Sequence, residues 1–99
     1  MITVKNIIDW SKPHAAAIGG RHTNIGNDKI EFSIVGGARG LYGDFVNDFE
    51  IAIRDKENRE FITRFFYPDA NDDVIGYMSG EDLESLLNKV FKEKDFQVR

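Results

Sequence analysis

The residues of this chain that could do chemistry are few, and its two histidines are the first to consider. His14 and His22 lie eight residues apart, whereas two histidines that bind zinc from one helix lie four apart. Arg21 and Tyr42 could join His22 in a small nuclease-type site, with a general base and a cationic group. Because nothing in their spacing requires such a site, an enzyme is the less favoured alternative.

Other catalytic and ligand-binding patterns are incomplete. The chain has no cysteine, which excludes a disulfide, a thiolate metal site and a cysteine nucleophile. Residues 69–73 are similar to the start of a calcium-binding EF-hand loop, but Val74 and Gly80 stand where that loop needs glycine and glutamate. The glycines of 36–43 lack the spacing of a phosphate-binding loop and instead predict a turn with positive φ. We therefore expect no metal and no cofactor.

The charge of the chain is acidic and unevenly distributed. The formal net charge is −4, whereas nucleic-acid-binding proteins usually carry a basic stripe. No lysine or arginine stands between Arg64 and Lys89, and six acids do: Asp69, Asp72, Asp73, Glu81, Asp82 and Glu84. These acids are typical of a solvated loop and helix start, or of a surface that docks onto a basic protein. We expect no direct contact with nucleic acid.

A second segment combines arginines with aromatic residues. Residues 59–66 carry Arg59 and Arg64 among three phenylalanines, a combination found on RNA-binding sheets. The segment lacks the glycine that the RNA-recognition pattern places between its aromatic residues. We interpret it as part of a core strand over 61–67, with a cross-strand ion pair between Glu50 and Arg64.

The elements that position these residues can be read from hydrophobic periodicity. Ser79 is a suitable N-cap for a helix over about 80–93, whose apolar stripe is Leu83, Leu86, Leu87, Val90 and Phe91. A short helix is expected after Thr3, and a further helical turn over 15–18. Alternation of apolar and polar residues predicts antiparallel strands over 29–35 and 45–53, and the segment 61–67, apolar on both faces, fits a third strand. The turn-forming residues 26–28 would let 23–25 pair with 29–35, and 74–78 could form a short edge strand.

These elements predict one compact α+β domain spanning residues 1–99. Its three- to four-stranded antiparallel meander sheet carries the C-terminal amphipathic helix and the short N-terminal helix on one face. No apolar run approaches the roughly 20 residues that span a bilayer, and residues 1–9 do not have the pattern of a signal peptide. We expect a cytoplasmic protein without membrane contact.

The function that fits these observations best is protein binding. Small acidic domains without cysteine are common among stoichiometric inhibitors, including phage or mobile-element anti-defence proteins of the anti-CRISPR type and toxin-immunity proteins. We expect a partner with a basic, nucleic-acid-handling surface. The expected contact residues are the six acids above together with Arg39, Tyr42, Asp44 and Asp48. The alternative is a self-associating accessory subunit, a homodimer paired through the strand over 74–78.

Overall fold

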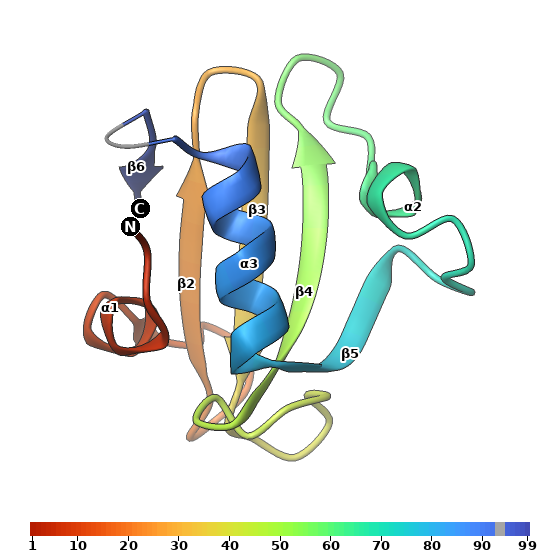
Figure 1. The fold of residues 1–99 in the computed structure, drawn as a ribbon. Helices are drawn as coiled ribbons and strands as arrows, with labels where there is room; N and C mark the ends of the chain where they lie inside the picture. The colour runs from red at the N-terminus through yellow and green to blue at the C-terminus, as the bar shows by residue number, and fades with distance from the viewer. Residues whose placement is uncertain (93–94) are drawn as a thin grey trace.

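The computed structural model describes residues 1–92 and 95–99, which form an α+β fold with one antiparallel sheet (Figure 1). In chain order the elements are α1 (Val4–Asp9), β1 (Lys12–Pro13), β2 (Arg21–Gly26), β3 (Ile30–Gly36), β4 (Asp48–Asp55), α2 (Thr63–Phe66), β5 (Val74–Ser79), α3 (Gly80–Val90) and β6 (Gln97–Val98). The predicted α+β fold class is confirmed, and within these residues the sheet has six strands rather than the expected three to four.

The sheet is a meander in the order β1-β2-β3-β4-β5. Strands β1 and β6 both pair with the outer side of β2, where Lys12 lies opposite His22 and Val98 lies opposite Ile25. Strand β5 forms the other edge, as expected for the segment over 74–78. One edge of the sheet is therefore covered by two short strands and the other is formed by β5 alone.

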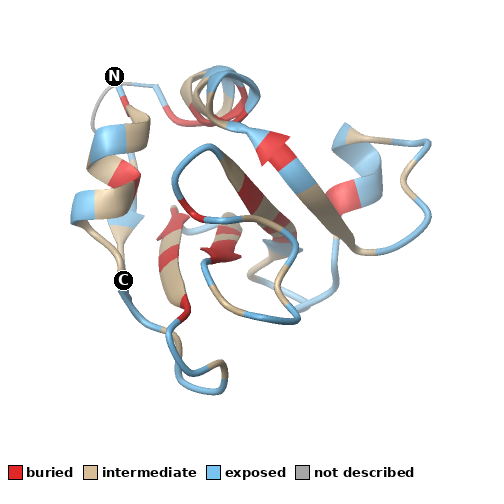
Figure 2. Cartoon of the chain, turned by 90° about the horizontal axis from the view of Figure 1, so that it is seen from below, coloured by how far each residue is buried: buried red, intermediate tan, exposed pale blue. Residues whose placement is uncertain are grey.

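The hydrophobic core lies between the sheet and the helices α1 and α3, which pack on the same face (Figures 1 and 2). Alternate residues of the three central strands point into it because successive side chains of a strand face opposite sides. The fully buried members from the strands are Ile25, Phe32, Ile34, Phe49, Ile51 and Ile53. Phe91 follows α3 and packs edge-on against Phe32, with 5.4 Å between ring centroids.

Both predicted helices on this face are confirmed, with clear caps. The Ser79 hydroxyl accepts the Asp82 N–H at 3.1 Å and begins α3. Thr3 and Asn6 cap the start of α1 reciprocally through side chain and backbone. Helix α3 ends at Val90, so the expected extension to 93 is too long. Positions 93 and 94 themselves lie outside the described residues.

The predicted core strand over 61–67 is wrong. Phe61 makes a single bridge to Arg54, after which the chain turns into α2. The turn is fixed by Thr63, whose buried hydroxyl accepts the Ile53 N–H at 2.9 Å and donates to the Asp73 carbonyl at 2.6 Å. Phe65 is 83% exposed rather than in the core.

Two smaller expectations also differ from the structure. The Arg64 guanidinium donates to the Asn71 carbonyl at 3.2 Å, and the Glu50 carboxylate accepts the Tyr42 N–H, so the expected ion pair between Glu50 and Arg64 is not formed. The segment 15–18 is a turn and not a helical turn, because His14 Nδ1 accepts the N–H groups of both Ala16 and Ala17.

Within residues 1–92 and 95–99, no helix is both long enough and apolar enough to cross a membrane.

Candidate functional site

The edge strand β5 contains a β-bulge. Gly76 and Tyr77 lie opposite the single residue Glu50 of β4, where the register of the pair shifts. Tyr77 has a φ of +54°, which is uncommon for a residue other than glycine. A bulge breaks the alternation of side chains and re-aims one of them. The Tyr77 side chain is consequently 65% exposed.

Tyr42 lies directly over this bulge. A Cβ at Gly76 would come within 2.6 Å of the Tyr42 Cβ, so only glycine leaves room for it. The Tyr42 carbonyl accepts the Tyr77 N–H at 2.8 Å, and the Tyr42 N–H donates to Glu50 Oε1 at 2.9 Å. The two tyrosine rings are 6.0 Å apart between centroids. The backbone therefore fixes an exposed pair of tyrosines.

The segment that follows Tyr42 is held by two aspartates. Asp44 Oδ1 accepts the N–H groups of Asn47, Val46 and Asp48, and Asp48 Oδ1 accepts the Asp44 N–H at 2.7 Å. The backbone hydrogen bonds from Asn47, Val46 and Asp48 hold the pKa of the exposed Asp44 carboxyl far below its usual value. Asp44 therefore carries its negative charge throughout the physiological pH range.

Tyr77 separates two hollows. The first has a volume of about 460 Å³ and is lined by Arg39, Leu41, Asp44, Asp48 and Tyr77, together with three small residues. Arg39, Asp44 and Asp48, which the sequence predicts as contact residues, therefore lie next to the tyrosine pair. We call Arg39, Leu41, Tyr42, Asp44, Asp48 and Tyr77 the tyrosine surface.

The second hollow is a cleft of about 550 Å³ between β5 and α3. Its lining residues are Tyr67, Ile75, Gly76, Tyr77, Met78, Ser79, Asp82, Leu86 and Lys89. Burial raises the pKa of the Tyr67 hydroxyl, and the charge of Asp82 raises it further. Asp82 is thus the one predicted contact residue that lines this cleft.

The remaining predicted acids do not form one patch. Asp69, Asp72 and Asp73 precede β5, whereas Glu81 follows it, and a six-residue strand separates its ends by about 20 Å. Glu84 Oε2 accepts the Val4 N–H at 2.6 Å, so this half-buried carboxylate joins α3 to α1. The six acids are therefore divided into Asp69, Asp72 and Asp73 before β5, Glu81 and Asp82 in the first turn of α3, and Glu84, whose carboxylate is bonded to α1.

The fold does bring the two histidines together. Because β1 pairs with β2, the rings of His14 and His22 lie 6.1 Å apart between centroids. The lone pair of His14 Nδ1 is taken by two backbone N–H groups, so a neutral His14 has no nitrogen left for a metal. Arg21 donates to the hydroxyl and the carbonyl of Ser11. No observation here favours the nuclease alternative.

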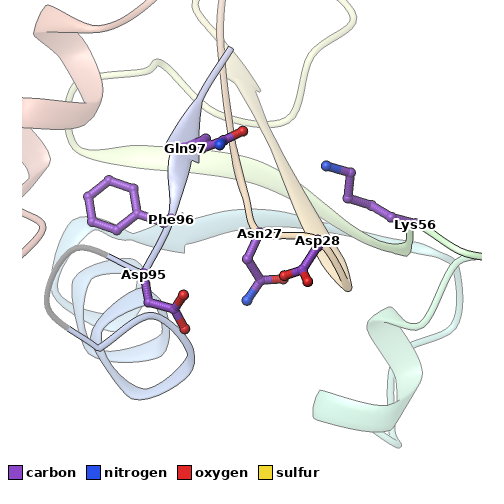
Figure 3. Close-up of a pocket in the computed structure, with 6 residues that line it drawn as sticks. All are labelled: Asn27, Asp28, Lys56, Asp95, Phe96 and Gln97. Atoms are coloured by element: carbon purple, nitrogen blue, oxygen red, sulfur yellow. The ribbon is translucent and has the colours of Figure 1, made fainter.

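A further hollow lies at the turn between β2 and β3 and has a volume of about 320 Å³ (Figure 3). Its lining residues are Asn27, Asp28, Lys56, Asp95, Phe96 and Gln97. The side-chain oxygen of Asn27 is already used by the turn, where it accepts the N–H groups of Lys29 and Ile30. In the part of the chain that the structure describes, no three histidine or acidic side chains are grouped to hold a metal ion.

The sequence does not single out Tyr77 as a candidate contact residue. It identified Tyr42, but the partner ring is exposed only because of a bulge, which no alternation pattern shows. The signal available was Gly76, since a glycine inside a strand often marks a bulge or a close approach of another segment.

Comparisons with protein-family models, with curated proteins and with solved structures find no significant match to this chain.

Proposed function

We propose that this chain is a small protein-binding module that docks through the tyrosine surface onto a protein with a basic surface. The observation that carries the proposal is the Tyr42–Tyr77 pair, which is exposed yet fixed by backbone hydrogen bonds. Tyr42 and Tyr77 are 54% and 65% exposed.

Three physical arguments support this function. Tyrosine is among the residues that contribute most to the affinity of protein interfaces. A surface that is already rigid loses less conformational entropy when it binds. The flanking carboxylates of Asp44 and Asp48, on a chain with net charge −4, favour a partner of opposite charge.

The proposal extends to inhibition. A basic protein surface often serves to hold nucleic acid, since phosphate contacts are made by lysine and arginine. A module that occupies such a surface would block nucleic acid competitively and in a one-to-one complex. This is the mode of action expected of an anti-defence or toxin-immunity protein.

Partner capture tests the proposal. Tagged wild-type protein and a double variant, Tyr42→Ala with Tyr77→Ala, are incubated with lysate of the native host and washed at low and at high salt. We expect the wild type to retain one dominant basic protein that high salt releases and the double variant to lose it. Phe65→Ala is the matched control, because Phe65 is 83% exposed on α2 outside the tyrosine surface. Equal capture by the double variant would contradict the proposal.

Self-association through β5 is the second candidate, because β5 does form an edge of the sheet. Tyr42 covers Gly76 and occupies the N–H of Tyr77, so the second half of this edge is already in use. Bulges and covering loops are ways in which edge strands avoid pairing with other chains. A dimer found by size-exclusion chromatography with light scattering, and abolished by Val74→Pro, would favour this alternative.

A further inference from the structure

The cleft between β5 and α3 has the dimensions of a binding pocket. Its volume of about 550 Å³ lies within the usual range of roughly 300–1,000 Å³ for ligand sites. Ile75, Met78 and Leu86 give it an apolar lining, and the rings of Tyr67 and Tyr77 add aromatic faces. A partner side chain placed here would lie against these apolar and aromatic groups in an open groove.

The charge in the cleft is placed at its ends. Asp82 lies in the first turn of α3 and Lys89 in the last, about 10 Å apart along the helix axis. Among the described residues the Asp82 carboxylate has no hydrogen bond and no ion pair, since only its backbone N–H is bonded, to Ser79. The Asp82 end of the cleft therefore offers a free anion beside apolar and aromatic walls.

An arginine side chain matches this combination. Its aliphatic stem can cover apolar surface while the charged head stays at the rim. Its planar guanidinium can stack on a tyrosine ring and bind a carboxylate through two hydrogen bonds, which the ammonium group of lysine cannot do. At the Asp82 end of the cleft, a glutamate side chain would meet the like charge of Asp82, and an uncharged apolar side chain would leave Asp82 without a partner.

We infer that the cleft between β5 and α3 binds one arginine side chain of the docked protein, with its guanidinium on Asp82 and its stem against Ile75 and Leu86. The inference rests on the proposed function and adds the chemistry of one partner residue to it. Tyr77 belongs to both the cleft and the tyrosine surface, so the arginine would lie directly beside the main contact.

The test uses the full chain labelled with ¹⁵N and titrated with N-acetyl-L-arginine amide in the millimolar range. We expect saturable shifts of the amide signals of Tyr77, Met78, Asp82 and Leu86. Asp82→Asn should weaken this binding about tenfold or more, because a charged hydrogen bond is lost. Asp28→Asn, at the distant β2–β3 turn, is the matched control and should leave it unchanged.

Comparison of probes and variants decides the inference. N-acetyl-L-norleucine amide has a similar stem without the charge and should bind markedly more weakly. Equal shifts with norleucine, equal binding by Asp82→Asn, shifts confined to other regions, or no shifts at all would each overturn the inference. Because the wild-type titration reports by itself, the result does not depend on the folding of a variant.

Failure of this inference can be told apart from failure of the proposed function. Tyr42 does not line the cleft, so Tyr42→Ala tests the tyrosine surface alone, and Asp82→Asn tests the cleft alone. If Asp82→Asn captures the partner as well as the wild type does while Tyr42→Ala does not, the arginine pocket is wrong and the docking surface stands. If Tyr42→Ala captures the partner as well as the wild type does while Asp82→Asn does not, docking through the tyrosine surface is wrong and the arginine pocket stands.

Discussion

Thr63 illustrates how a single hydroxyl decides the course of the chain. It is fully buried and bonds both to Ile53 on β4 and to Asp73 just before β5. It thereby joins the start of α2 to the two strands on either side of the loop. A buried polar group that loses its partner costs free energy, so this one side chain explains why the segment turns here.

We predict that Thr63→Val destabilises the protein by about 1–3 kcal/mol, because the Ile53 N–H and the Asp73 carbonyl lose a buried partner. The measurement is the free energy of unfolding in urea. Thr63→Ser keeps the hydroxyl and should retain most of the stability. A valine variant as stable as the serine variant would show that the hydroxyl does not hold the turn.

His22 gives a prediction about pH. Burial, followed by the nearby charges of His14, Lys12 and Arg21, lowers the pKa of His22 below 6.5. The unfolded chain therefore binds more protons than the folded one, and stability rises with pH. The contribution of His22 is fully present above pH 6.5 and decreases as the pH falls below 6.5 toward the lowered pKa.

Urea unfolding at pH 7.5 and at pH 5.5 measures this contribution. The wild type should lose stability at pH 5.5, and His22→Gln should lose less, because glutamine has no group that titrates in this range. The same loss of stability in both proteins would assign the pH dependence to other groups.

Part of the candidate site can be predicted from the sequence. Arg39, Tyr42, Asp44 and Asp48 are expected from their place in a glycine-rich turn and in an acidic chain, and the structure brings them to one surface. Tyr77 was not identified, because its exposure depends on a bulge that forms only when β5 pairs with β4. Pairing across strands is a tertiary property that local patterns do not contain.

The bulge in β5 is the element on which the tyrosine surface depends. We predict that Gly76→Ala keeps the fold but displaces Tyr42, because the new Cβ would come within 2.6 Å of the Tyr42 Cβ. Overpacking of this kind costs about 1–3 kcal/mol. The readouts are the nuclear Overhauser contact between the rings of Tyr42 and Tyr77, which should disappear, and partner capture, which should fall.

Ser33→Ala serves as the control for this variant, since Ser33 lies on central strand β3 and outside the tyrosine surface. It should keep both the ring contact and the capture. If Gly76→Ala also kept both, the close packing of Tyr42 on the bulge would not be what fixes the pair.

The elements themselves were predicted unevenly. The capped helix over Gly80–Val90 and the hairpin of β2 and β3 were recognisable, because caps, turn residues and periodicity are local signals. The segment 61–67 was not, because its apolar residues on both sides also fit a strand buried on both faces. What decides its structure is the bonding of Thr63 to two distant backbone positions.

The whole molecule combines a negative net charge with the proposed docking surface at one edge of the sheet. Electrostatic attraction between partners of opposite charge speeds their encounter, and added salt screens it. We predict that the association rate constant with the captured partner falls as salt rises, whereas the dissociation rate constant changes little. Surface plasmon resonance at several salt concentrations measures both, and an association rate constant independent of salt would contradict a basic partner.

The most direct test of the docking surface is photo-cross-linking in the native host. A photoreactive phenylalanine analogue, p-benzoylphenylalanine, is placed at position 42 and, in a separate protein, at position 65 on the exposed α2. We expect position 42 to cross-link to one dominant basic protein and position 65 not to cross-link to it. Cross-linking of that protein from position 65 but not from position 42 would contradict this expectation, because the partner would then bind elsewhere on the molecule.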